Sequence, residues 1–381
     1  MNSRDRVISV INHNMPDRIP FDLGSTPNTG IHINAYRDLL SYLDMDSYDL
    51  KICDITQQLA CIQENILNKF SIDTRGVLPK NPSNWRLNIE NSDDGSSYFV
   101  DQYGIGWKMP KGGYYFDLYN SPLSKFSVKD LNKYNFPNSY DKMRIRGLEE
   151  EIIDLYNKGF FIIFNSIGGG FLELSLLLRG FEEFYCDLAL NPKFACILMD
   201  KLLEIEMNYW DFILSNFGEY IQMIYTANDL GSQESLLMSP SFYRKYIKPR
   251  QKKLNEFIKK KKSDIFIYFH SCGSILEIIP DLIEVGVDAL NPIQVSAADM
   301  DTKKLKKEFG QDITFWGGGI DTQRVLPYGT PKEIKEEVKR RIDDLAEGGG
   351  FVFAAVHNIQ SDVPPQNIMA MWEALEEYGR Y

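Results

Sequence analysis

Short runs of consecutive apolar residues alternate with longer amphipathic segments over most of the chain. The clearest runs are 160–164, 265–269 and 351–356, which contain apolar residues only. Such runs are typical of strands buried on both faces, as in a parallel sheet. Segments with helical periodicity, such as 331–346, lie between them. Counted from Ile19, about eight strands alternate with helices, which predicts an α/β fold of the (β/α)8 TIM-barrel type.

The pattern also gives approximate positions for these elements. We expect the strands near residues 16–24, 71–79, 160–165, 221–225, 265–270, 287–290, 313–316 and 351–356. Early in the chain, the apolar spacing predicts helices over 33–43 and 54–70.

Residues of about 84–120 break this rhythm. The stretch is polar and aromatic, and turn signals at Asp93-Asp94-Gly95 and Lys111-Gly112-Gly113 separate its short apolar runs. This pattern predicts an antiparallel β-meander inserted into a single barrel domain that covers residues 1–381. The insertion could act as a lid, present a partner surface, or only cover one end of the core.

Polar residues recur where the predicted strands end. In a barrel the carboxyl ends of all strands face one mouth, so side chains at those points converge. No single position is specific, but their repetition at equivalent points indicates a functional site. The residues at these points are Asp73, Arg75, Asn165, Asp229, His270, Cys272, Asn291 and His357.

His270 and Cys272 are the most informative pair. Residues i and i+2 of a strand point to the same side, so both can reach one point just where the strand ends. An imidazole nitrogen and a thiolate at about 2.0–2.3 Å from a common ion form a zinc arrangement. The alternative is a small buried cysteine beside a hydrogen-bonded core histidine. The chain has only four histidines, and a second one, His357, ends another apolar run, which favours the metal.

Asp73 and Arg75 leave two interpretations open. Their spacing places both on one side of a strand. They could form a local surface ion pair of little energetic value. They could also point into the mouth of the barrel and bind a polar substrate.

Composition narrows the class of partner. The chain carries 53 acidic and 42 basic residues, a formal net charge of −11. Nucleic acid is therefore not expected as the main partner, because phosphate binding needs a basic surface. The sequence has no long apolar run for a membrane span and begins with polar residues, so we expect a cytoplasmic protein. Five scattered cysteines fit free thiols in a reducing compartment.

Four segments resemble the uroporphyrinogen decarboxylase superfamily. They are SRDRVISVINHNMPDRIPFD at the start, HSCG after a strand, WGGGIDTQRVLPYGTPKEI, and HNIQSDVPPQNIMAMWEAL near the end. The resemblance covers nearly the whole chain and implies a (β/α)8 barrel, in agreement with the strand count. The superfamily contains porphyrinogen decarboxylases and zinc-dependent methyltransferases that work with corrinoid proteins. The aromatic meander resembles that of the methyltransferase branch.

Two motifs distinguish these branches. The decarboxylases carry an arginine-rich RQAGR segment after the first strand, whereas this chain has Asp22-Leu23-Gly24-Ser25-Thr26-Pro27 there. A substrate with many carboxylates would therefore lack its bidentate arginine contacts. The methyltransferases carry HxC at a strand end and a later cysteine at the last strand end. His270 and Cys272 match the first motif, and His357 stands in place of the later cysteine.

The resemblance implies a zinc methyltransferase that moves a methyl group between a small methylated ether or thiol and a corrinoid protein. Zn2+ would be held by His270, Cys272 and His357. Asp229 or Glu234 would be an extra ligand or a proton donor. The residues expected to orient the substrate are Asp73, Arg75, Asn165, Gln233 and Asn291. No DxHxxG corrinoid motif is present, so the corrinoid would arrive on a separate protein.

Two other functions stay open from the sequence. One is a metal-free decarboxylase with Asp73 on the pyrrole nitrogens. The other is a non-catalytic barrel that binds a partner through the meander. The oligomeric state is open as well, a homodimer included.

Overall fold

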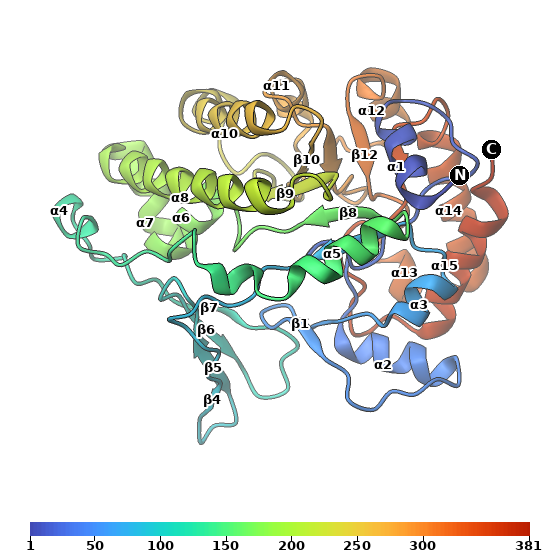
Figure 1. The fold of residues 1–381 in the computed structure, drawn as a ribbon, viewed down its shortest axis with the longest axis horizontal. Coiled ribbons are helices and arrows are strands. Elements are labelled where there is room, and N and C mark those ends of the chain that lie inside the picture. Colours follow the sequence, from blue (N-terminus) through green and yellow to red (C-terminus); the bar gives the residue numbers. More distant parts are fainter.

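A computed structural model describes all residues, 1–381, with side chains. Figure 1 shows a ring of strands and helices, from which the small antiparallel sheet projects at the lower left. The two termini lie close together on the opposite side. None of the helices combines the length and the apolar character that crossing a membrane requires.

Seven parallel strands form the central sheet, in the order β13-β12-β11-β10-β9-β8-β3. Their bounds are β3 Thr74–Val77, β8 Phe161–Phe164, β9 Met223–Ala227, β10 Phe266–His270, β11 Ala289–Asn291, β12 Thr314–Trp316 and β13 Phe351–Val352. Neighbouring strands are parallel at every pairing.

The segment 20–22 closes this sheet into a ring. The Phe353 amide donates to the Pro20 carbonyl at 2.9 Å, on the β13 side. On the β3 side, the Asp73 amide donates to the Phe21 carbonyl, also at 2.9 Å. The segment makes too few such bonds to count as a strand, but it occupies the eighth strand position. The predicted (β/α)8 barrel is confirmed.

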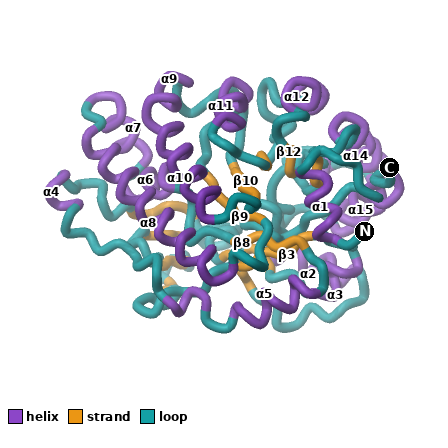
Figure 2. The backbone as a smooth tube through the Cα atoms, turned by 45° about the horizontal axis from the view of Figure 1, so that its top comes forward, coloured by secondary structure: helices purple, strands orange, loops and turns teal.

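Helices surround the strands, as Figure 2 shows with purple helices outside orange strands. The α-helices are α1 Ser3–Ile11, α2 Ile33–Tyr42, α3 Glu64–Lys69, α4 Val128–Leu131, α5 Leu148–Asn157, α6 Phe171–Arg179, α7 Phe181–Leu190, α8 Lys193–Phe217, α9 Pro240–Phe242, α10 Lys248–Lys261, α11 Ile279–Glu284, α12 Thr302–Phe309, α13 Val325–Tyr328, α14 Pro331–Leu345 and α15 Pro365–Tyr378. Short 3-10 helices are η1 Lys142–Ile145 and η3 Leu276–Ile278, and η2 Tyr243–Ile247 is a π-helical stretch between α9 and α10.

Two small sheets lie outside the ring. One pairs β1 Ile52–Asp54 with β2 Leu59–Ala60. The other is antiparallel, with β4 Glu90–Asn91, β5 Ser97–Val100, β6 Gly106–Met109 and β7 Asp117–Asn120 in sequential order. The helix expected over 54–70 is wrong for its first half, because β1, a turn and β2 precede α3.

The barrel interior is a separate hydrophobic cluster of 12 buried residues. Its strand members alternate with residues that face the outer helices, and Val7, Val10 and Ile11 of α1 pack against them. α1 therefore fills the amino end of the barrel. Tyr268 of β10 belongs to this interior cluster. His270, two residues further on, continues the inward-facing set at the carboxyl end.

Candidate active site

His270, Cys272 and His357 converge at the carboxyl end of the barrel. One ligand atom from each lies within 4.8 Å of the other two. The Cys272 Sγ lies 3.4 Å from His270 Nε2, and the two imidazole centroids are 5.5 Å apart. Ligand atoms of a tetrahedral zinc ion are separated by roughly 3.3–4 Å, given its bond lengths. The donor set and its spacing therefore fit a zinc ion, with modest side-chain adjustment.

Asn291 fixes the orientation of the His270 ring. The Asn291 Nδ2 donates to the Trp316 carbonyl at 2.9 Å, so the Oδ1 atom faces His270 Nδ1 at 2.7 Å. Nδ1 therefore carries the proton, and the Nε2 lone pair is directed toward Cys272. Asn291 is fully buried. The prediction that it binds substrate is wrong, because both ends of its amide are engaged inside the protein.

His357 is held in a similar way by an amide that the sequence did not indicate. Its Nε2 lies 3.1 Å from Asn28 Nδ2, and the Tyr225 hydroxyl donates to the Oδ1 of the same amide. Asn28 therefore donates to Nε2, which presents a lone pair in the structure. A metal bound at Nε2 would replace this hydrogen bond, whereas a metal bound at the other nitrogen would need the second tautomer.

Burial sets the charge of all three groups. It lowers the pKa of His270, and it lowers that of His357 to about 4 with a contribution from the charge of His270. Both rings are therefore neutral at pH 7, as metal ligation requires. Burial, followed by Asp229 and Glu173, raises the pKa of the Cys272 thiol. Without a cation the thiol keeps its proton, so metal binding would release it.

Two carboxylates flank the three residues. The Cys272 amide donates to Asp229 Oδ1 at 2.8 Å, and the same oxygen lies 3.7 Å from His270 Nε2. Glu173 stands in the first turn of α6, and burial, with the charge of Asp229, raises its pKa to about 8. Glu173 thus carries a proton at neutral pH. Its position directly after the glycine loop 168–170 was the only sequence signal for it.

These groups open into one large cavity of about 650 Å3, within the size range of ligand sites. Barrel residues His270, His357, Asp229 and Glu173 line it. The meander contributes a second wall, and its lining residues are Asp101, Gln102, Tyr103, Trp107, Phe116, Asp117 and Leu118. The insertion therefore forms part of the cavity and does more than cover the core.

Asp73 and Arg75 lie away from this cavity, and the expectation that they bind substrate is wrong. β3 begins at Thr74, so Asp73 stands at the amino end of its strand, where it pairs with Arg6 and Arg18. Arg75 faces outward, with its Nη2 2.8 Å from Glu64 Oε1. Neither interpretation offered by the sequence holds, because the two residues do not pair with one another.

The other three predicted residues differ in their placement. Asn165 follows β8 at the mouth but is buried, and its Nδ2 donates to the carbonyls of Ser25 and Val77. Gln233 and Glu234 are exposed on the loop after β9 and do not line the cavity. A direct part in the chemistry is therefore not supported for these three, whereas Asp229 stands beside His270.

Comparison with known proteins gives a consistent picture. The model of the uroporphyrinogen decarboxylase (URO-D) family matches residues 103–378. The uroporphyrinogen decarboxylase of Geobacter sulfurreducens is 24% identical over 189 residues, 50% of this chain and 51% of that protein. The chain thus spans about half the length of the curated decarboxylases it matches.

Methyltransferases of Methanosarcina mazei match over more of the chain. The methylcobamide:CoM methyltransferase MtbA is 25% identical over 268 residues, 69% of this chain and 73% of that protein. A solved structure, described as a methyltransferase from Methanosarcina mazei, superimposes with a TM-score of 0.66 over 99% of both chains at 16% identity. At this identity the superposition shows a shared fold.

Proposed function

Because this chain belongs to the uroporphyrinogen decarboxylase family, we propose that it is a zinc-dependent methyltransferase of that family. The methyl group would move between a small methylated ether or thiol and a corrinoid carried by a separate protein. The observation that carries the proposal is the convergence of His270, Cys272 and His357 at the mouth of the barrel. We further propose that residues 1–381 act as one barrel domain in the cytoplasm.

The residues around the three ligands have separable tasks. Zinc, when bound, would supply Lewis acidity toward an ether oxygen or hold a thiol as thiolate. Asn291 keeps the His270 Nε2 lone pair directed to the site. Asp229 holds the Cys272 backbone by accepting a hydrogen bond from the Cys272 amide. Glu173 carries a proton at neutral pH and lines the same cavity. It can donate that proton to the alkoxide that remains when an ether loses its methyl group.

A decarboxylase is the second candidate, because several of the curated relatives are named uroporphyrinogen decarboxylase. The segment 22–27 offers no arginine for substrate carboxylates. Asp73, which the decarboxylase interpretation required in the mouth, is at the other end of the barrel. The structure of the site therefore favours the methyltransferase.

Metal analysis and activity assays test the proposal together. The purified protein should contain close to one zinc per chain and should demethylate a methyl ether or methylate a thiol when given a reduced corrinoid protein. Loss of that activity on chelation and its return with zinc would support the proposal. Porphyrinogen decarboxylation by the metal-free protein would establish the second candidate instead.

A further inference from the structure

Arg144, on η1, stands in the wall of the cavity and differs from the other buried arginines. Its side chain is 1% exposed. Nε donates to the Asn138 carbonyl at 3.2 Å and Nη2 to Gln102 Oε1 at 2.7 Å. Both acceptors are neutral, and no carboxylate oxygen lies within 4.0 Å of the guanidinium. Nη1 has no protein acceptor.

The other buried arginines of the chain are Arg6, Arg75 and Arg341. Each contacts a carboxylate, on Asp73, Glu64 and Glu337 respectively. That pattern is expected, since a buried charge costs free energy unless it is paired. Burial lowers the pKa of Arg144, but a guanidinium keeps its proton in proteins. Asp141, three residues earlier, acts on the guanidinium only through longer-range charge. Arg144 is therefore a buried cation that no carboxylate of the chain contacts.

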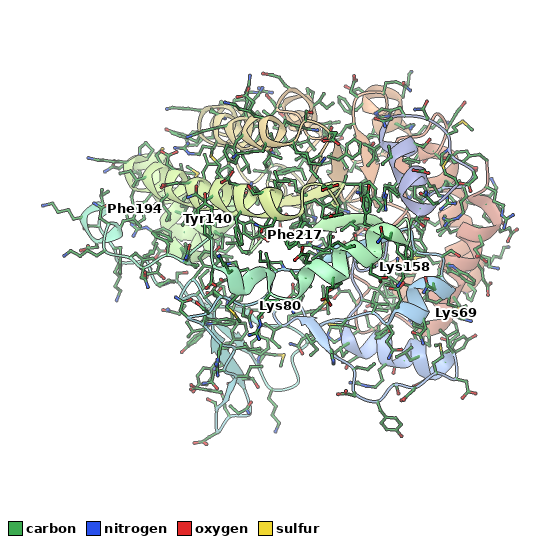
Figure 3. The ribbon with its side chains drawn as sticks, in the orientation of Figure 1. Lys69, Lys80, Tyr140, Lys158, Phe194 and Phe217 are labelled. Atoms are coloured by element: carbon green, nitrogen blue, oxygen red, sulfur yellow. The ribbon has the colours of Figure 1, made fainter.

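A second cation adjoins it. The Lys80 amide donates to the Arg144 carbonyl at 2.8 Å, and Lys80 also lines the cavity. Figure 3 labels Lys80 between α5 and the small sheet. The Lys80 ammonium makes no ion pair within 4.0 Å. The contact between them is through the backbone: the Lys80 side chain is exposed, and its Nζ lies 3.6 Å from where a Cβ on Gly147 would stand. Arg144 is therefore the buried cation of this wall, and Lys80 is an exposed one next to it along the backbone contact.

Gln102 orients the guanidinium. Its Nε2 donates to the Ile167 carbonyl at 3.2 Å, which directs its Oε1 toward Arg144 Nη2. Beside it, the Tyr103 hydroxyl is buried with no hydrogen-bond partner, and burial raises its pKa, so it remains a neutral donor. Both residues come from the connection between β5 and β6, so the meander builds this part of the wall.

None of the acidic residues that line the cavity contacts Arg144, and two of them are held by other donors. Asp101 accepts from the Trp107 indole at 3.0 Å and from two backbone amides. Asp54 accepts from the amide and the side chain of Gln57. These carboxylates are held by donors of their own, which leaves Arg144 open to a ligand.

We propose that Arg144 and Lys80 form an anion subsite, and that the substrate carries a carboxylate or similar compact oxyanion distant from its methyl group. This inference rests on the proposed function, because the histidines of the candidate metal site line the same cavity. The guanidinium offers Nη1 to the oxyanion, and Lys80 adds a second charge-assisted bond. Charged hydrogen bonds of this kind are the strong ones, so the oxyanion should dominate substrate affinity.

The test compares two acids with their neutral amides, by calorimetry on the full chain. The pairs are 4-methoxybenzoate with 4-methoxybenzamide, and methoxyacetate with methoxyacetamide. We expect at least one acid to bind about tenfold more tightly than its amide, a difference of about 1.4 kcal/mol. If neither acid is preferred to its amide, or if neither binds, the inference is wrong.

Variants assign the preference to the subsite. Arg144→Gln should reduce the acid-to-amide ratio to near one, and Arg144→Lys should retain part of it, because lysine keeps the charge without the planar fork. Lys80→Gln should lower the ratio several-fold. Arg37→Gln, at an exposed arginine on α2, should leave it unchanged. An unchanged ratio in folded Arg144→Lys and Lys80→Gln would overturn the assignment even if Arg144→Gln fails to fold.

The Cys272→Ala variant separates this inference from the proposed function. A preference for the acid that survives in this variant arises at Arg144 and Lys80, with no contribution from metal ligation. A preference that disappears with Cys272 would mean that the anion binds at the metal, and the anion subsite would be rejected. Absence of zinc from the wild-type protein would instead count against the methyltransferase and leave the subsite standing.

Discussion

The two ends of the barrel differ in whether their buried charged groups have partners of opposite charge. At the amino end, Asp73 is fully buried and accepts from Arg6 Nη1 at 2.6 Å and from Arg18 Nη1 at 2.8 Å. It also accepts from the Phe21 amide at 2.9 Å. Arg6 in turn contacts Asp17 at 2.7 Å. This cluster is internally balanced and leaves no donor or charge for a ligand.

At the carboxyl end the ionisable groups are left without partners of opposite charge. Arg144 contacts only neutral oxygens, Glu173 is protonated, and the Cys272 thiol needs a cation before it can ionise. In barrels of this kind the carboxyl end carries the active site and the amino end supports stability. The contrast separates buried charges that the protein pairs internally from those that it leaves without an oppositely charged contact, which the proposed function assigns to ligand binding.

The largest effect should follow from removing the cysteine at the mouth. Cys272→Ala should lower zinc content from near one per chain to near zero, because two imidazoles alone bind the ion weakly. The fold should remain, since Cys272 stands at the rim beyond the barrel interior. Elemental analysis with circular dichroism measures both. Unfolding of Cys272→Ala, together with a metal-free wild type, would make Cys272 a packing residue.

A substitution at the amino end of the barrel should lower the free energy of unfolding. Asp73→Asn should cost about 3 kcal/mol of unfolding free energy or more, because breaking a buried ion pair leaves uncompensated charge. Zinc content of the folded fraction should not change. Asp154→Asn is the matched control, since its pair with Lys158 is exposed on both sides and should be worth less than about 1 kcal/mol. Equal losses in the two variants would contradict the balanced-cluster interpretation.

The sequence predicted the barrel because its strands are continuous apolar runs, which local pattern reports well. It also predicted the HxC pair, because alternation along β10 is a local property. The prediction that Asp73 and Arg75 bind substrate was wrong because β3 begins only at Thr74. Because the strand is shorter than expected, Asp73 lies at its amino end beside Arg6 and Arg18, and Arg75 points outward to Glu64.

Other site residues depended on contacts that local pattern does not contain. Asn28 and His357 are 329 positions apart in the chain. The sequence places Asn291 at a strand end, but the orientation of its amide depends on the Trp316 carbonyl of the next strand. Arg144 lay in a segment without periodicity, and only the folded structure shows that it lacks a carboxylate.

A buried acid on α8, which does not line the cavity, gives a prediction about pH. Burial raises the pKa of Glu206, on α8, to about 8, and its Oε2 has no partner. The unfolded chain releases this proton near the ordinary value of about 4.5, so the stability that the protonated form contributes is lost as pH rises from there to 8. Glu206→Gln mimics the protonated acid. It should be more stable than wild type by roughly 4 kcal/mol at pH 8 and equal to it at pH 4.

Thermal or urea unfolding at the two pH values measures this difference. A variant equally stable at both would be expected if Glu206 dominates the pH dependence. If Glu206→Gln is less stable than wild type at pH 8, the Glu206 carboxylate is ionised in solution. It then has a partner that stabilises its charge, and the prediction is wrong.

The smallest effect should come from the amide that orients His270. Asn291→Ala removes the acceptor of the Nδ1 proton, so the ring loses its fixed tautomer. Removing such a partner of a metal-ligating histidine typically costs about 10–100-fold in metal affinity. Asn291→Asp keeps an acceptor at this position but places a carboxylate against the Trp316 carbonyl. It should retain most of the zinc affinity while losing unfolding free energy.

Competition with a zinc chelator and urea unfolding separate these two effects. The affinity order expected is wild type close to Asn291→Asp, with Asn291→Ala weaker; the stability order places both variants below wild type. If Asn291→Asp loses as much affinity as Asn291→Ala, then the amide acts by packing alone. His270 would then be oriented by its place on β10, two residues beyond the interior Tyr268, and the mouth would need no hydrogen-bonded support to present its ligands.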